Sequence, residues 1–377
     1  MNNIKQKLLN CILSFFCIFT LFSCNSNKQY KTALTKPVEI AILMPSSGAS
    51  ANIGMQYSQL IKMGLSDSVQ ADVNVVVYDG ADEKQAMASL DKIIARKTQI
   101  ILGPLYSPIT KLVADSIKGR DIIMITMSNN PALAEDNLFV FGHAPLKQAD
   151  RIINYFLDAH YSNFISLLPS GQYTKTVNQV LQDMILQKNA TLVHSEFYQD
   201  SPESIDKAVA LVSSSVDKIN EMDDVSTKPV IYLSDDPKNL QLLFASISKY
   251  NLDKKAVITG DNRIDIDYPE HINIIFTGSL NMLNGNIRQR GKDIGINHMT
   301  FLHLMAYDLG RMTGNYIDDL YNKDRFLARL HSKEPYVGIS GSIYFVDSIA
   351  QRKYDIIKRE GGQYSTLSSQ DDKSLIN

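Results

Sequence analysis

Cysteine is nearly absent from this chain of 377 residues, and its few copies are confined to one end. The three cysteines are Cys11, Cys17 and Cys24. Cleavage before Cys24 would leave the mature chain a single cysteine, which excludes an internal disulfide, a cysteine-based zinc site and thioester enzyme chemistry. A single thiol at the start of a mature chain is best interpreted as an anchor.

The sequence also lacks the short motifs of common enzymes. It has no phosphate-binding loop, no dinucleotide-binding fingerprint and no nucleophile elbow, and its seven histidines never show the H-E-x-x-H spacing of a zinc site. The S-x-x-K pattern of penicillin-recognising serine enzymes occurs at Ser204–Lys207 and Ser215–Lys218, but no K-[ST]-G accompanies it, so chance explains both. We therefore expect a protein that is not an enzyme and that carries no cofactor and no metal.

An excess of positive charge is missing as well. The formal net charge is −2 and the isoelectric point is about 6.4, without a basic stripe that would follow a phosphate backbone. Nucleic acid is therefore excluded as an expected partner. Because 44% of the residues are hydrophobic, the chain can bury a core, and its length favours two domains or lobes.

The N-terminus has the layout of an export signal. Lys5 and Lys7 precede an apolar run, Leu8–Phe22, which small and polar residues follow. A membrane-spanning helix needs about 20 apolar residues, and this run is shorter and interrupted by polar side chains. We predict that residues 1–23 are a cleaved signal, in preference to an uncleaved anchor.

The residues before Cys24, Leu21-Phe22-Ser23, resemble the bacterial lipobox. That resemblance implies that Cys24 is acylated and becomes the first residue of a lipoprotein held on a membrane. Residues 24–36 are polar without an apolar period, so we expect a flexible linker. Asn25 after the cysteine favours the outer over the inner membrane, by analogy with lipoprotein sorting.

Short runs rich in valine and isoleucine recur through the body, each followed by a segment with helical periodicity. Residues 82–97 are an example of such a helix, with Asp82 at its N-cap. The apolar runs, which read as strands covered on both faces, are 38–44, 73–78, 99–102, 122–125, 164–168, 190–194, 230–233, 256–259 and 272–276. This alternation predicts doubly wound α/β structure, and the strands are too many for one sheet, so two α/β lobes are expected.

Three loops after predicted strands are rich in hydroxyl and amide side chains: 46–50, 106–110 and 126–131. In open α/β sheets ligands bind beyond the carboxyl ends of strands, near free N–H groups of helices. Such loops suit a carboxylate or another small polar anion. The alternative interpretation, that the same residues are ordinary helix caps, remains open at this point.

Residues 41–48 (AILMPSSG), with Ile53-Gly54-Met55, resemble the opening of type I periplasmic binding proteins of the leucine/isoleucine/valine class. Leu102-Gly103-Pro104-Leu105 and 126–131 fall where that family has further ligand loops. The resemblance implies two lobes joined by a hinge that close over a ligand. We assign 37–144 with 279–330 to the first lobe, 145–278 with 331–360 to the second, and 361–377 to a polar tail.

The resemblance also implies a ligand site. Hydroxyls and amides of the first lobe would hold a ligand carboxylate, and an apolar side chain would cap the pocket; the candidates are Ser46, Ser47, Ile53, Ser107, Ser128 and Asn129. On the second lobe, where an acid usually holds an α-amino group, the matching positions are Asp236 and Asn262. Asp261 is adjacent to the second of these, so the alignment could be displaced by one residue.

Other motifs are closer to a branch of the same fold, the lipoprotein activators of penicillin-binding proteins. These motifs are Met127–Asn130, Ala306–Leu309 and the stretches 336–345 and 352–357. The resemblance, with the neutral Asn262, implies a non-catalytic envelope lipoprotein that regulates a peptidoglycan synthase. The alternative is the substrate-binding receptor of an ABC importer for amino acids, amides or small organic acids. The expected partners are the membrane, a penicillin-binding protein or an ABC permease, and a small polar ligand.

Overall fold

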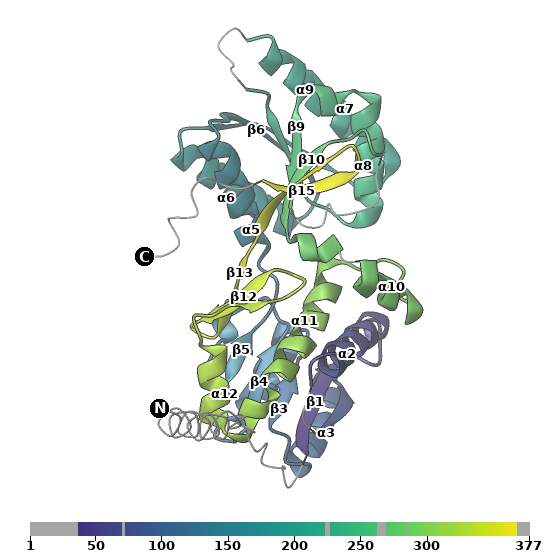
Figure 1. The fold of residues 1–377 in the computed structure, drawn as a ribbon. Helices are drawn as coiled ribbons and strands as arrows, with labels where there is room; N and C mark the ends of the chain where they lie inside the picture. The colour runs from purple at the N-terminus through teal and green to yellow at the C-terminus, as the bar shows by residue number, and fades with distance from the viewer. Residues whose placement is uncertain (1–36, 70–71, 223–226, 262–268, 284, 368–377) are drawn as a thin grey trace, which may run out of the picture. The chain divides into compact units, whose positions relative to one another are not determined.

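The computed structural model describes residues 37–69, 72–222, 227–261, 269–283 and 285–367. The predicted signal, the linker and two predicted site residues, Cys24 and Asn262, lie outside the described residues. Within the described part of the chain, no helix is long and apolar enough to cross a membrane. The described chain forms two mixed sheets covered by helices, which confirms the predicted class of two α/β lobes (Figure 1).

The first lobe is built on an eight-stranded sheet. Its strands, in spatial order, are β11 (Tyr336–Val337), β12 (Ser342–Val346), β13 (Ile349–Lys353), β5 (Leu138–Val140), β4 (Ile123–Thr126), β3 (Ile100–Leu102), β1 (Val38–Met44) and β2 (Val73–Asp79). The strands from β5 to β2 are parallel to one another, and β13 joins them in parallel at β5. The β11–β12–β13 segment is antiparallel within itself.

Both faces of this sheet are buried, as the continuous apolar runs predict. Along β1, Ile40, Ile42 and Met44 pack on one face, while Ala41 and Leu43 pack on the other. The first face is covered by α2 (Ala51–Ser66), α10 (Gly285–Asp293), α11 (Phe301–Asn315), η4 (Ile317–Tyr321) and α12 (Lys323–Leu330). The opposite face is covered by α3 (Glu83–Ala95) and α4 (Ser107–Ile117), and the short turns η1 (Pro131–Leu133) and η3 (Leu280–Leu283) lie in connections.

Helices α2 and α11 approach closely because each has a glycine at the contact. A Cβ atom added to Gly310 would lie 2.0 Å from the Ile61 carbonyl oxygen, and one added to Gly64 would lie 2.1 Å from the Tyr307 carbonyl oxygen. Neither distance is compatible with a real side chain, since both neighbours are backbone atoms. The two helices therefore pack backbone against backbone across the first lobe.

The second lobe is built on a seven-stranded sheet. Its strands, in spatial order, are β15 (Gln363–Leu367), β14 (Asp355–Glu360), β10 (Ile274–Gly278), β9 (Val257–Gly260), β8 (Val230–Leu233), β6 (Asn163–Pro169) and β7 (Thr191–Tyr198). The strands from β10 to β7 are parallel. One face packs on α5 (Pro145–Asp158) and α6 (Gln172–Gln187), and the other packs on α7 (Pro202–Asn220), α8 (Pro237–Lys249) and α9 (Leu252–Lys255).

The C-terminal strands divide differently from the sequence-based assignment, which placed 331–360 in the second lobe. The structure places β11–β13 in the first sheet, and only β14 and β15 in the second. The chain passes between the sheets at Tyr354, the residue between β13 and β14. Alternating side chains identify an antiparallel strand but do not say which sheet edge it joins, and this explains the error.

The predicted polar tail, 361–377, is also corrected in part. Gly361 and Gly362 have φ values of +55° and +76°. They turn the chain so that Gln363–Leu367 pairs antiparallel with β14. Glycine adopts such angles without steric cost, which suits a tight hairpin. Residues 368–377 lie outside the described residues.

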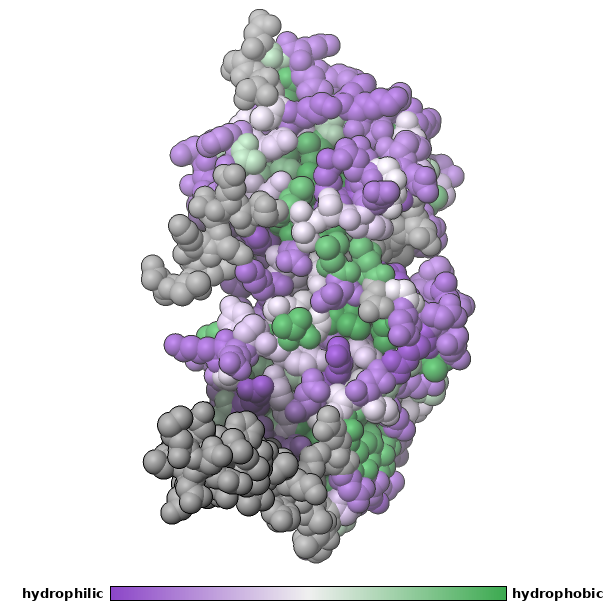
Figure 2. All heavy atoms as spheres, in the orientation of Figure 1, coloured by the Kyte–Doolittle hydropathy of each residue, from purple (hydrophilic) through white to green (hydrophobic). Residues whose placement is uncertain are grey.

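Hydrophilic residues cover most of the face of the molecule drawn in Figure 2, and hydrophobic residues form separate groups between them. Large apolar side chains that are exposed come from many elements, among them Met55, Leu186, Leu211 and Val337. Single exposed apolar residues of this kind are normal for a folded protein. They do not by themselves define a binding surface.

Candidate functional site

The loop after β1 is organised by an acid at the end of β2. The Ser46 N–H donates to Asp79 Oδ1 over 2.9 Å, and the Ala81 N–H donates to the same atom over 3.1 Å. Burial alone raises the pKa of Asp79, but hydrogen bonds from Ser47, Ser46 and Ala81 outweigh it and hold the pKa below its usual range. Ser46 and Ser47 are exposed, and in this structure they order the loop around Asp79.

Two predicted residues of the first lobe come together. Ser107 begins α4, Ser128 follows β4, and their Oγ atoms lie 2.7 Å apart. Ser128 is buried; its N–H donates to Thr126 Oγ1 over 3.0 Å, and its Oγ accepts the Asn130 N–H over 3.2 Å. These contacts join the loops after β3 and β4 into one polar edge.

The other predicted residues of this lobe differ in exposure. Ile53, in the first turn of α2, is half-buried against the core, whereas Asn129 is exposed. The structure adds one link that the sequence analysis missed, because the Tyr106 hydroxyl donates to Ser50 Oγ over 2.8 Å. Both residues belong to loops that were predicted from the sequence as ligand loops, but only the folded chain shows that these loops are in contact.

The edge of the second lobe carries two buried carboxylates. Asp235 follows β8 and is 7% exposed; its Oδ2 accepts the Tyr198 hydroxyl over 2.7 Å, and its Oδ1 accepts the Asp236 N–H over 2.7 Å. Asp261 follows β9 and is 1% exposed, and its Oδ2 accepts the Ser234 hydroxyl over 2.9 Å. Since Leu233 of β8 is in register with Gly260 of β9, both acids lie at the same edge of the sheet.

The two residues predicted from the sequence, Asp236 and Asn262, each directly follow one of these acids. Asp236 is exposed, and it occupies the N-cap position of α8, where its side chain accepts no hydrogen bond from the helix. Asn262 lies outside the described residues. The signal that could have identified the buried acids is their distance from the apolar strands, since Asp261 directly follows β9 and Asp235 comes two residues after β8.

The segments that connect the lobes run close to these edges. Burial raises the pKa of Tyr354, the residue between β13 and β14, to about 12; the positive charge of Arg352 opposes the shift and the negative charge of Asp261 adds to it. Arg352 also donates to the carbonyl oxygens of Phe141 over 2.7 Å and Gly142 over 3.0 Å, with its guanidinium 4.6 Å from the Phe141 ring centre. Arg352 thus ties the end of β13 to the segment that follows β5.

A buried acid holds the loop between β11 and β12. Asp308 of α11 accepts the Ile339 N–H over 2.9 Å, the Ser340 N–H over 2.6 Å and the Ser340 hydroxyl over 2.6 Å. Burial raises the pKa of Asp308, and the hydrogen bonds from Ser340 and Ile339 and the charge of Arg352 oppose that shift. The same loop accepts a hydrogen bond from Asn281 of η3 at the Gly338 carbonyl, over 3.4 Å.

His303, near the start of α11, is a structural residue. Its Nδ1 accepts the Thr300 N–H over 3.0 Å, so Nε2 carries the proton and donates it to Gln56 Oε1 over 2.9 Å. Burial lowers the pKa of His303 to about 4, which keeps the ring neutral at neutral pH. Within the described ranges, no group of three or more histidine, cysteine, aspartate or glutamate side chains is arranged to hold a metal ion.

The two edges offer complementary chemistry. The first-lobe edge presents serine hydroxyls beside the N-terminus of α4, groups that suit a carboxylate. The second-lobe edge presents Asp235 and Asp261, groups that suit a cation, because a buried carboxylate is best compensated by a positive partner.

Comparison with known proteins agrees with this description. The family model described as periplasmic binding protein matches residues 37–260. An uncharacterised protein of Rickettsia prowazekii is 58% identical over 372 residues, covering 98% of this chain and 100% of its own length. The leucine-specific-binding protein of Salmonella typhimurium is 28% identical over 173 residues, covering 43% of this chain and 47% of its own length.

Solved structures share the fold at low sequence identity. An ABC transporter substrate-binding protein from Sphaerobacter thermophilus has a TM-score of 0.65 and 13% identity, with 89% of this chain and 97% of that chain covered. The C-domain of LpoA from Haemophilus influenzae, a regulator of PBP1A, has a TM-score of 0.62 and 14% identity, with 88% and 100% covered. Both likenesses concern the fold alone.

Proposed function

This chain belongs to the periplasmic binding protein family, and on that premise we propose that it is a solute receptor that binds a small zwitterion of the amino-acid type. Ser107 and Ser128 receive the ligand carboxylate, and Asp235 and Asp261 receive its ammonium group. The observation that carries the proposal is the pair of buried carboxylates at one edge of the second sheet. The sequence, with the neutral Asn262, favoured a regulator over a receptor. The pair of buried carboxylates leads us to favour the receptor instead.

The proposal predicts stabilisation of the full chain by an amino acid at 1 mM in thermal unfolding. A ligand whose Kd is about 1 µM contributes about 4 kcal/mol at that concentration. Each amino acid is compared with its analogue that lacks the amino group, such as leucine with 4-methylpentanoate, and only the zwitterion should stabilise. Asp261→Asn should weaken binding at least 100-fold, because the ligand cation loses its buried counter-charge.

Asp236→Asn is the matched control, since Asp236 is also an acid at this edge but is exposed. It should bind as the wild type does. If no amino acid stabilises the chain, the receptor function is wrong. If Asp236→Asn alone abolishes binding, the assignment of the ammonium group to Asp261 is wrong and the assignment made from the sequence is right.

A second candidate function is regulation of a peptidoglycan synthase from the membrane. Two observations favour it: the likeness to a domain of LpoA, and polar groups at both edges that are bonded within their own lobe. Such bonding suits an edge that no longer takes a ligand. An envelope lipoprotein tethered through Cys24 fits both functions.

Crosslinking in native membranes separates the two functions. A regulator should be trapped with a penicillin-binding protein, whereas a receptor should be trapped with ABC permease subunits. Labelled palmitate is expected on the wild type and absent from Cys24→Ala, which should also lose the crosslink that the wild type shows, because the tether concentrates the protein at the membrane. Unchanged palmitate in Cys24→Ala would contradict the predicted anchor.

A further inference from the structure

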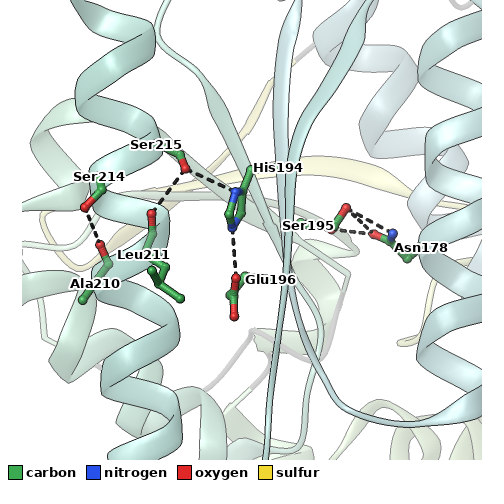
Figure 3. Close-up of polar contacts among 9 residues, drawn as sticks. Asn178, His194, Ser195, Glu196, Ala210, Leu211, Ser214 and Ser215 are labelled. Atoms are coloured by element: carbon green, nitrogen blue, oxygen red, sulfur yellow. Dashed lines mark hydrogen bonds and ion pairs between the residues drawn. The ribbon is translucent and has the colours of Figure 1, made fainter.

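Away from the candidate site, the second lobe contains a serine, a histidine and a glutamate that are linked one to the next by hydrogen bonds. Ser215 lies on α7, and His194 and Glu196 lie on the neighbouring edge strand β7 (Figure 3). Ser215 Oγ is 3.2 Å from His194 Nδ1, and His194 Nε2 is 3.1 Å from Glu196 Oε2. A nucleophile bonded to a base, which a third group orients, is the arrangement of a base-activated serine.

A β-bulge points His194 at Ser215. Along the β6–β7 pair, Phe164 is in register with Leu192 but Ile165 is in register with His194, so Val193 is an extra residue. Side chains alternate along a regular strand, so without a bulge His194 would share the face of Leu192, two residues before it, toward α6. The bulge at Val193 puts His194 on the opposite face, toward α7. Bulges that redirect a side chain are frequent beside active sites.

The opposite face of β7 carries a serine whose partner is an amide and not a histidine. Ser195, between His194 and Glu196, points toward α6, where its Oγ bonds to Asn178 Oδ1 over 3.2 Å (Figure 3). His194 and Glu196 are two residues apart and therefore share the α7 face. The α6 face of β7 thus carries a serine that bonds to an amide, Ser195, and its α7 face carries the imidazole that bonds to Ser215.

The hydrogen bonds define where the protons lie. When the Glu196 carboxylate accepts the proton of His194 Nε2, Nδ1 carries no proton and accepts the Ser215 hydroxyl. The Leu211 carbonyl, 3.3 Å from Ser215 Oγ, competes for that hydroxyl proton in the resting protein. The histidine and glutamate side chains are 28% and 22% exposed, so a small molecule can reach the group from solvent.

Two further side chains of α7 lie on the helix face of Ser215. Leu211, one turn before it, is exposed and offers apolar surface to an acyl chain. Lys218, one turn after it, is exposed and places positive charge on the same face. Ser215 and Lys218 form one of the S-x-x-K patterns that the sequence analysis assigned to chance, and the base that the fold brings to Ser215 is His194.

We propose that Ser215 is a nucleophile that takes an acyl group from small carboxylic esters, with His194 as its general base and Glu196 as a positioning residue. Ser215 Oγ forms a bond to the ester carbonyl carbon while its proton passes to His194 Nδ1. The bond from that carbon to the leaving oxygen breaks, and the leaving oxygen takes the proton from His194 and departs as an alcohol. Water, deprotonated by the same imidazole, then hydrolyses the acyl-serine to a carboxylic acid and restores the hydroxyl. The inference does not depend on the proposed receptor function.

The test treats the purified full chain with a fluorophosphonate probe and locates the adduct by peptide mass spectrometry. One adduct is expected, on Ser215, because its oxygen displaces fluoride while His194 takes the proton. General-base assistance is worth about 100-fold or more, so His194→Gln should slow labelling by about 100-fold. Added imidazole should restore part of the rate in His194→Ala, whereas a purely structural histidine would not respond to it.

Ser214→Ala is the matched control. Ser214 precedes Ser215 on the same helix, is exposed, and donates to the Ala210 carbonyl over 3.2 Å. This variant should label as the wild type does, whereas Ser215→Ala should not label. Glu196→Gln should slow labelling by about tenfold, and Glu196→Asp should recover part of the loss because it keeps the charge.

Acyl transfer itself is followed with 4-nitrophenyl acetate, which should release about one equivalent of nitrophenol per chain in an initial burst that Ser215→Ala lacks. The proposal is wrong if Ser215 carries no adduct and no burst occurs. It is equally wrong if Ser214 and Ser215 label alike, or if folded His194→Gln, checked by circular dichroism, labels at the wild-type rate.

Discussion

Replacing Asp308 with alanine is expected to lower the free energy of unfolding by about 4 kcal/mol. The Asp308 carboxylate accepts three hydrogen bonds from Ile339 and Ser340 in a fully buried position. Without it, two buried backbone N–H groups and one hydroxyl have lost their acceptor, and each unsatisfied group costs about 1–3 kcal/mol. Removing one partner from a buried charged network typically costs about 3–5 kcal/mol. Urea unfolding at neutral pH measures the loss.

The matched control for this change is Asp91→Ala, since Asp91 is an exposed aspartate within α3. Its loss should alter the free energy of unfolding by no more than about 0.5 kcal/mol. Asp308→Asn keeps the shape of the side chain but turns an amide donor toward other donors, so its cost should lie between those of the two alanine variants. Equal stability of Asp308→Ala and Asp91→Ala would contradict the role assigned to Asp308.

Replacing Gly310 with alanine is expected to destabilise the protein by about 3 kcal/mol, although alanine favours a helix over glycine by about 1 kcal/mol. The added Cβ would lie 2.0 Å from the Ile61 carbonyl oxygen, so α2 and α11 would have to separate along their contact. Overpacking of this kind costs about 1–3 kcal/mol or more. The expected fall in the melting temperature is roughly 4 °C for a protein of this size, measured by scanning calorimetry.

Gly285→Ala separates packing from helix propensity. Gly285 begins α10, and a Cβ atom built on it would have no neighbour within 4 Å. Alanine there should leave the melting temperature unchanged or raise it slightly. If both glycine variants behave alike, the close approach of α2 and α11 does not limit stability.

Local patterns in the sequence were sufficient to predict the fold class and part of the candidate site. Buried strands such as β1 and β8 are continuous apolar runs, which marks parallel strands covered on both faces wherever they lie. The loops that contain Ser107 and Ser128 were predicted because a polar loop after such a strand must lie at the carboxyl edge of the sheet. The contact between these two serines follows from the adjacency of β3 and β4.

Other features were beyond the reach of local patterns. An alternating strand such as β13 fits either sheet, and its pairing with β5 depends on contacts between residues about 200 positions apart. Asp261 and Asn262 are both polar residues after a strand, and only the folded backbone shows that the Asp261 side chain is buried and bonded to Ser234. A displacement of one residue changes the side chain that faces inward.

The sequence by itself determined that this protein is a two-lobed α/β protein with polar loops at the edge of its first sheet. This was possible because buried strands and amphipathic helices can be recognised from the pattern of apolar side chains among neighbouring residues. Only the tertiary structure decided which acids are buried, which sheet the C-terminal strands join, and that His194 meets Ser215. Each of these depends on register between distant segments. The bulge at Val193 is the clearest case, since it places His194 on the α7 face although regular alternation from Leu192 would place it on the α6 face.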